Sequence, residues 1–465
     1  MRTTDNNYDK DERRRGQDVN DLVETENETF NIPDLQLIAN QKIKDMELEK
    51  HKNLLIFPPN DSVYGDKIGE ETIFSLKGNI LKTNNIMGFV GVNDTRLTIT
   101  SRFVKKDDEN DYFLHYMLQR VLSLNITRLD QSKKNESIWN FLPYLFPYYL
   151  KRALSQGIYK SYQTVNYNNS NVKGVIDIKR HLKFNIPFSG KIAYSSREYN
   201  VDNEITELIR HTIEEISSNR LVNQVLKNDK DTIDAVHQII SSTNAFNKND
   251  RSKIIAKNHR AVKHPYFFKY KELQRLCKMI LNHDKLSFGH EKDRIYGLIF
   301  DGAWLWEEYL NKLLHDKFIH PKSKIRKDGD HLFQDENDKP IQEIYPDFIS
   351  ISEPKIIADA KYKFLNKSGY DKDYGRDDYF QMLAYMLRYT SNLGLLLFPY
   401  KETYVEKEPR EKVLTMKGRH TPSKTLTKLG LTIPQNAADF NKFIEDIKKS
   451  EDDIKNYIEQ LAVSS

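Results

Sequence analysis

The stretch Tyr345-Pro-Asp-Phe-Ile-Ser-Ile-Ser-Glu-Pro-Lys-Ile-Ile-Ala-Asp-Ala-Lys-Tyr362 reads as two short apolar strands separated by a turn at Ser352-Glu-Pro354. Because side chains two apart on a strand share a face, Asp359 and Lys361 should point the same way. If the hairpin folds about Glu353, Asp347 falls opposite Asp359. Directly opposed strand residues have Cβ atoms roughly 4.5–5.5 Å apart. The pattern therefore predicts two carboxylates and a lysine at the end of one hairpin.

Two carboxylates that close together repel each other unless a cation binds them or one takes a proton. Mg²⁺ favours oxygen ligands and often uses only one or two carboxylates, with water and substrate phosphate completing its shell. A lysine beside such a site supplies positive charge for a phosphate or an attacking water. We therefore predict a magnesium site at Asp347 and Asp359, with Lys361 next to it. An isolated Asp-x-Lys is weak evidence, since this chain is rich in both residues and a solvated surface strand would carry them equally well.

Pro346-Asp347, followed after eleven residues by Asp359-Ala-Lys361, resembles the signature of the PD-(D/E)XK nuclease superfamily. The resemblance implies that Asp347, Asp359 and the backbone carbonyl of Ala360 bind Mg²⁺, with Mn²⁺ as a substitute. It also implies that Lys361 positions or activates the hydrolytic water.

Two further residues are supporting candidates. Glu307 lies among large apolar residues, where a carboxylate is costly unless it is paired or bound to metal, and superfamily nucleases often carry such a helix glutamate at the site. The alternative is a solvent-facing charge, which one of the adjacent Glu307 and Glu308 must be. Gln381 and Tyr385 lie four apart on one helix face. Their spacing resembles the motif that follows the active strand in RecB-like members, although a purely structural helix remains the alternative for Tyr385.

The chain has 465 residues, of which 30% are charged and 11% aromatic, a globular composition. Its net charge of +5 does not by itself imply nucleic-acid binding, so local clusters must carry that argument. One cluster spans residues 179–183, and a second comprises Lys417, Arg419, His420, Lys424 and Lys428. The single cysteine, Cys277, excludes intramolecular disulfides and cysteine-based zinc sites, and fits a buried thiol in a reducing cytoplasm. We expect a cytoplasmic protein without a signal peptide or membrane span.

The order of patterns predicts an α+β multidomain protein. Residues 1–48 are dense in charge and are expected to form a flexible extension. Residues 49–190 should form a β-rich and helical region that docks on a partner, and residues 191–290 a helical middle. Residues 291–465 should form an α/β nuclease domain with a mixed sheet, opened by a buried helix over 295–310.

The chain contains no Gly-x-x-x-x-Gly-Lys-Ser/Thr loop, so an energy-driven machine would need its motor from another subunit. The order of Lys173-Gly174, Leu305-Trp-Glu307, Pro346-Asp347, Asp359-Ala-Lys361 and Gln381 resembles the McrC family, the nuclease subunits of McrBC-type restriction systems. The resemblance implies cleavage of double-stranded DNA and a McrB-like AAA+ GTPase hexamer as partner, which alone binds GTP and is stimulated by the subunit. Two alternatives stay open: a non-catalytic subunit that only docks, and a stand-alone RecB-like repair nuclease.

Overall fold

The computed structural model describes residues 1–7, 15–22, 31–46, 53–58, 67–93, 95–103, 111–122, 142–219, 222–227, 229–282, 295–321, 330–364, 376–401, 410–416 and 423–463. The chain is a mixed α+β protein that forms two compact units. The first combines Met1–Thr127 with His290–Ser465, and the second is Arg128–Gly289. The two ends of the sequence therefore fold together, and the middle of the chain forms a unit of its own.

The first unit contains a five-stranded sheet in the order β1-β7-β6-β11-β3. Its strands are β1 (Arg2–Thr4), β3 (Asn53–Phe57), β6 (Ile86–Val92), β7 (Thr95–Thr100) and β11 (Ile295–Asp301). Strand β11 comes from the C-terminal part of the chain, yet it pairs in parallel with β3 and antiparallel with β6. The sheet is therefore complete only when both parts of the chain are present.

The helix predicted over 295–310 is wrong in its first half, because residues 295–301 form β11 and helix α10 spans Gly302–Leu314. Both faces of β11 are buried, so its sequence is a continuous apolar run, and periodicity does not separate such a strand from a buried helix. The carboxylate of Asp301 begins the helix by accepting the backbone N–H groups of Ala303 and Trp304, at 2.8 and 3.2 Å.

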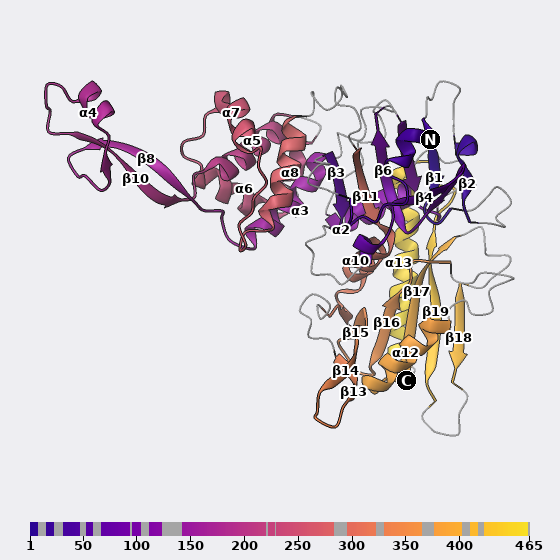
Figure 1. Ribbon diagram of the computed structural model, residues 1–465. Coiled ribbons are helices and arrows are strands. Elements are labelled where there is room, and N and C mark those ends of the chain that lie inside the picture. Colours follow the sequence, from indigo (N-terminus) through magenta and orange to yellow (C-terminus); the bar gives the residue numbers. More distant parts are fainter. Residues whose placement is uncertain are drawn as a thin grey trace. The chain divides into compact units, whose positions relative to one another are not determined.

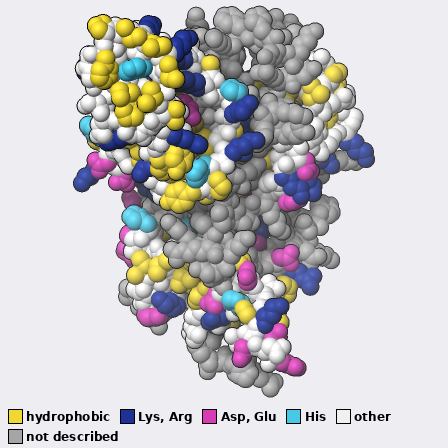
Figure 2. Space-filling model, turned by 60° about the vertical axis from the view of Figure 1, so that its left-hand side comes forward, with side chains coloured by type: hydrophobic (Ala, Val, Ile, Leu, Met, Phe, Trp, Pro, Cys, Tyr) yellow, Lys and Arg dark blue, Asp and Glu magenta, His cyan; other side chains and the backbone are white. Residues whose placement is uncertain are grey.

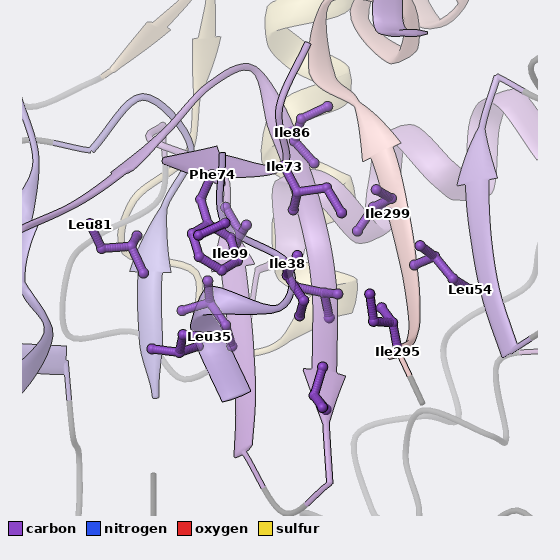
Figure 3. Packing of buried hydrophobic residues seen from close by; sticks show 14 of the residues in the cluster. Leu35, Ile38, Leu54, Ile73, Phe74, Leu81, Ile86, Ile99, Ile295 and Ile299 are labelled. Carbon is purple, nitrogen blue, oxygen red and sulfur yellow. The ribbon is translucent and has the colours of Figure 1, made fainter. Parts of the chain in front are cut away.

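Figure 3 shows the core beside this sheet, where Leu54, Ile86, Ile99, Ile295 and Ile299 from four strands converge. A small sheet of β2 (Gln17–Asp18), β5 (Ile80–Thr83) and β4 (Phe74–Lys77) and helix α1 (Ile32–Gln36) add to it. Parts of residues 1–48, expected to be a flexible extension, are packed here: β1 pairs with β7, and Val19, Leu35 and Ile38 are buried. The buried apolar side chains among the described residues of this stretch belong to one core, although many charged residues surround them in the sequence.

The second sheet of the first unit has six strands in the order β12-β15-β16-β17-β19-β18. They are β12 (Phe318–Ile319), β15 (Phe348–Ser350), β16 (Ile356–Ala360), β17 (Leu393–Lys401), β18 (Glu411–Thr415) and β19 (Thr425–Ile433). Strands β16, β17 and β19 are parallel and the outer pairs are antiparallel, so the sheet is mixed, as predicted. Helices α12 (Arg376–Arg388) and α13 (Phe440–Val463) lie on opposite faces of it (Figure 1).

The second unit consists of a helical part and a long hairpin. The helices are α3 (Leu142–Leu154), α5 (Glu204–Ser218), α6 (Lys230–Ser242), α7 (Arg251–Lys257) and α8 (Tyr270–Leu281). Strands β8 (Ser161–Asn169) and β10 (Ile192–Asn200) pair along their full length, and β9 (Val175–Ile176) adds to β10. Figure 1 shows this sheet running away from helices α5–α8, with helix α4 (Ile178–Phe184) near its far end.

Within the described part of the chain, no helix combines the length and the apolar character that crossing a membrane requires.

Candidate active site

The site forms where β15 and β16 pair in the second sheet. The ladder joins Phe348 to Ala358 and Ile349 to Ile357, so the next pair in the same register is Asp347 and Asp359. The predicted register is therefore confirmed. The Oδ2 atom of Asp347 accepts the backbone N–H of Ala360 at 2.8 Å, which turns this carboxylate toward the end of β16. Asp347 is 6% exposed and Asp359 2% exposed, so two carboxyl groups are buried side by side.

Lys361 follows β16 and lies against the same carboxylates. Its ammonium forms a close ion pair with Oδ2 of Asp359, donates to Oε1 of Gln381 at 2.9 Å and lies 3.7 Å from Oδ1 of Asp378. Burial alone would lower the pKa of Lys361, but the carboxylates of Asp359, Asp378 and Asp347 outweigh burial and raise that pKa above its usual value. The lysine is therefore held as a cation beside the acidic pair.

Helix α12 supplies the groups that hold Lys361 in place. The Nε2 atom of Gln381 donates to the hydroxyl of Tyr385 at 2.8 Å, and that hydroxyl donates to the carbonyl of Tyr345 at 3.2 Å. Burial, with the nearby charges of Asp359 and Asp347, raises the pKa of Tyr385 to about 12, so its hydroxyl stays a proton donor. The structure thus brings Gln381 and Tyr385 together at the predicted place, as a chain of hydrogen bonds between Lys361 and the strand that carries Asp347.

Glu307 approaches the same region from α10, the helix whose Trp306 Nε1 donates to the carbonyl of Leu397 in β17 at 3.2 Å. His320 lies between Glu307 and Asp347, and it was not among the candidates predicted from the sequence. The Nδ1 atom of His320 donates to the backbone carbonyl of Asp347 at 2.8 Å, and its Nε2 atom lies 3.7 Å from Oε1 of Glu307. The glutamate is therefore linked to Asp347 through the imidazole.

A family model described as "McrBC 5-methylcytosine restriction system component" matches residues 81–399, which is more than half of the chain and includes each of these side chains. The chain belongs to this McrBC family. Two solved assemblies from Thermococcus gammatolerans also contain chains that match weakly. No protein of curated function matches.

The first of these is a refined half-complex from a tetradecameric assembly of McrB AAA+ hexamers with bound McrC. The match has 14% sequence identity and a TM-score of 0.44, over 98% of this chain and 99% of that chain. The second is the cryo-EM structure of the McrBC complex, with 15% identity and a TM-score of 0.25, over 55% of this chain and 73% of that chain. The family assignment rests on the family model alone.

Three residues that contact the site in this McrBC-family chain were not predicted from the sequence: Asp378, Lys363 and His320. Asp378 lies in the first turn of α12, where acidic residues are common, yet it is 9% exposed and pairs closely with Lys363 as well as facing Lys361. Lys363 stands two residues after Lys361, so the spacing that placed Asp359 and Lys361 on one face extends to it. That extended spacing was the one available signal; nothing local in the sequence marked His320.

The basic stretch from Lys417 to Lys428 was predicted as a candidate for phosphate contacts, and two of its lysines are described. Lys417, Arg419 and His420 lie outside the described residues. Lys424 donates to the carbonyl of Ser391 at 2.5 Å, after the end of α12. Lys428 is 4% exposed, with its ammonium 4.9 Å from the ring centre of Tyr379 and 5.8 Å from that of Phe398. Both lysines therefore contribute to the local structure around the six-stranded sheet.

The carboxylates of Asp347 and Asp359 are the kind of oxygen ligand that Mg²⁺ prefers. Among the described residues, no three or more His, Cys, Asp or Glu side chains converge into a ready-made metal cage. Asp347 and Asp359 nevertheless present buried carboxylate oxygens next to each other, and Mg²⁺ commonly takes one or two carboxylates and completes its octahedron with water and phosphate. The residues present therefore fit a magnesium ion better than a zinc ion, which favours a closed set of nitrogen and sulfur ligands.

Proposed function

We propose that this McrBC-family chain is a Mg²⁺-dependent endonuclease subunit that cleaves double-stranded DNA. One observation carries the proposal: two buried carboxylates, Asp347 and Asp359, face each other beside the ammonium of Lys361. That combination supports phosphodiester hydrolysis, because the reaction requires a bound cation and a fixed positive charge where phosphate oxygens gain negative charge. The family assignment supports the same reaction class.

Asp347, Asp359 and the carbonyl of Ala360 would hold Mg²⁺, which acts as a Lewis acid on the phosphate and lowers the pKa of a bound water. Lys361 would keep its positive charge beside the phosphate or the attacking water. Gln381 holds that ammonium in position by accepting its hydrogen bond at 2.9 Å. Tyr385 holds Gln381 in turn, because its hydroxyl accepts a hydrogen bond from the Gln381 side chain. Glu307 would support the site indirectly, since His320 ties it to the backbone of Asp347.

The subunit is also proposed to act with a McrB-like AAA+ GTPase hexamer that binds GTP and recognises DNA. The sequence lacks a phosphate-binding loop of its own. The docking region expected at residues 49–190 includes the end of the hairpin in the unit Arg128–Gly289, and this end carries an apolar surface. This α4 surface, seen in Figure 2 as a concentration of hydrophobic side chains, comprises Val175, Ile178, Leu182, Phe184, Ile186 and Phe188, all at least 55% exposed. Exposed apolar clusters of this kind mark protein-binding sites.

A plasmid-cleavage assay with Mg²⁺, with and without the AAA+ GTPase partner, tests the proposal. We expect cleavage that requires Mg²⁺, the partner and GTP, together with faster GTP hydrolysis by the partner. Faster hydrolysis without any cleavage would instead identify a non-catalytic docking subunit. Cleavage that is indifferent to the partner would identify a stand-alone nuclease.

A further inference from the structure

Lys361 has polar or charged partners on two sides, and they belong to different parts of the site. One is Oδ2 of Asp359, a proposed ligand of the cation, with which Lys361 forms a close ion pair. The others are on helix α12: Oε1 of Gln381 at 2.9 Å and Oδ1 of Asp378 at 3.7 Å. The Lys361 side chain is 16% exposed, and those of Asp359 and Asp378 are 4% and 12% exposed, so water screens these charges only weakly. The ammonium thus stands between a metal ligand and a second carboxylate.

We propose that Lys361 and a divalent cation compete for Asp359, and that Asp378 is the positioning residue that receives the Lys361 ammonium when the cation binds. This inference rests on the proposed function, because it takes Asp359 as a ligand of the cation. It adds a residue, Asp378, and a reason for its place in the first turn of α12.

The competition follows from charge and size. An ammonium in close contact with a carboxylate oxygen blocks one side of it, and a divalent cation on the same carboxylate would repel that ammonium strongly at low exposure. The ammonium must then withdraw while staying near the phosphate. Lysine can do this because its charge sits on a flexible four-carbon stem. The shift is short, since Gln381 already accepts from Lys361 and Asp378 is 3.7 Å away.

Asp378 is suited to hold a second cation. It already pairs closely with Lys363, and it lies in the first turn of α12, where a negative side chain interacts favourably with the helix dipole. A carboxylate has two oxygens, and the structure directs Oδ2 of Asp378 to Lys363 and Oδ1 toward Lys361. One oxygen therefore remains for Lys361 after the cation has taken Asp359.

A simpler account is that Asp378 only adds negative charge near the metal, or only pairs with Lys363. A double-mutant cycle separates the accounts, because an effect of Asp378 that passes through Lys361 must disappear when Lys361 is gone. Asp377→Asn is the matched control: it makes the same change of charge in the same helical turn, but Asp377 is exposed. Lys363→Gln tests the second account, since it removes the other partner of Asp378.

The experiment measures Mg²⁺ binding to the full-length chain by titration calorimetry, with thermal unfolding of each variant as the check on folding. Lys361→Gln should bind Mg²⁺ more tightly, and Asp378→Asn more weakly, each by about tenfold, a typical size for coupling within one ion-pair network. In the Lys361→Gln background, Asp378→Asn should change the affinity by less than about twofold. Asp377→Asn should behave as the unaltered chain, and Lys363→Gln should not reproduce the loss caused by Asp378→Asn.

Three results would overturn the inference: no gain of affinity in Lys361→Gln, an equal loss from Asp378→Asn in both backgrounds, or the same loss in Lys363→Gln. The Lys361→Gln result stands even where Asp378→Asn fails to fold. Failure of the proposed function looks different. In that case the unaltered chain would not bind Mg²⁺, or Asp359→Asn would bind it equally well.

Discussion

The hydroxyl of Tyr362 lies 3.0 Å from the hydroxyl of Ser101, although 261 residues separate them in the sequence. The guanidinium of Arg102 stacks over the same tyrosine ring, 4.9 Å from its centre. Tyr362 directly follows Lys361, so the end of β7 in the first sheet helps to fix where the second sheet places its lysine. Residues from the N-terminal part of the chain thus support a site whose proposed catalytic residues all lie in the C-terminal part.

This relationship predicts that the C-terminal region does not fold alone. A fragment of residues 294–465 contains all the proposed catalytic residues, but its strand β11 would lose both neighbours, β3 and β6. Ile295 and Ile299 would lose the core in which they are buried. We expect the fragment to unfold without a cooperative transition in urea, monitored by circular dichroism, whereas the full chain unfolds cooperatively. A cooperative transition of the isolated fragment would show that this part folds independently of β3 and β6.

The proposed metal ligands give the second prediction. Asp359→Asn and Asp347→Asn each remove one anionic ligand, so Mg²⁺ affinity and DNA cleavage should fall together. We expect cleavage to drop by about a thousandfold or more, where each tenfold corresponds to about 1.4 kcal/mol of barrier. Asp377→Asn, an exposed carboxylate near the site, serves as the control and should cleave normally. Normal cleavage by both ligand variants would exclude the nuclease assignment.

The third prediction concerns the geometry of Lys361. Lys361→Ala should abolish cleavage while the protein stays folded and still binds Mg²⁺. Lys361→Arg keeps the charge, but a planar guanidinium cannot take the place of a compact ammonium between Asp359, Gln381 and Asp378, so cleavage should recover poorly. Single-turnover cleavage rates of the two variants test this. Full activity of the arginine variant would mean that the site requires only a positive charge there.

The hairpin was predictable from the sequence because local rules govern it. Two apolar runs around Ser352-Glu-Pro354 fixed the turn, and the turn fixed the register that places Asp347 opposite Asp359. The Gln381 and Tyr385 spacing was equally local, four residues on one helix face. These parts of the site depend on contacts close in sequence or on a single turn.

The remainder depends on tertiary contacts that leave no local pattern. Strand β11 is buried on both faces, so its apolar run does not alternate and resembles part of a buried helix. His320 meets Asp347 only because β12 pairs with β15, a pairing of two short strands. The sequence did not mark Asp378 as part of the site, because an acidic residue in the first turn of a helix is common for reasons of helix stability alone.

The fourth prediction uses Asp111, which joins Ser101 to helix α2 (Tyr112–Leu122). Its carboxylate accepts the backbone N–H groups of Ser101 at 2.6 Å and Leu114 at 2.9 Å, and burial raises its pKa to about 6. Between its ordinary pKa near 4 and about 6, the folded protein binds a proton that the unfolded chain releases. This group's contribution to the free energy of unfolding is therefore largest below that window and is lost as the pH rises through it.

At about 1.4 kcal/mol for each pKa unit, the loss amounts to at most about 3 kcal/mol. Urea unfolding of the unaltered chain and of Asp111→Asn should be measured across the window. The free-energy difference between them should shift in favour of the variant as the pH rises, because asparagine does not titrate. Asp377→Asn is the control and should run parallel to the unaltered chain. Parallel curves for Asp111→Asn as well would show that Asp111 titrates near its ordinary pKa.

The last prediction separates the two proposed activities. Phe184 and Phe188 on the α4 surface are 57% and 68% exposed, and replacing both by serine removes apolar area without touching a core. If this surface docks on the AAA+ GTPase, each buried aromatic anchor would be worth about 2 kcal/mol or more. The double variant should then bind the partner about a thousandfold more weakly, if the two contributions add, and lose its stimulation of GTP hydrolysis. Mg²⁺ binding, which belongs to the other unit, should not change.

Two matched proteins complete this test. Phe333→Ser removes a phenylalanine that is 65% exposed on β13 (Asp330–Gln334) in the other unit, and it should stimulate the partner normally. Asp359→Ala should also dock and stimulate GTP hydrolysis, but cut no DNA. GTP turnover of the partner, measured with each variant, decides between the possibilities. If folded Asp359→Ala no longer stimulates turnover, docking and cleavage are not separable along this chain. If the double serine variant stimulates normally, the α4 surface is not where the partner binds.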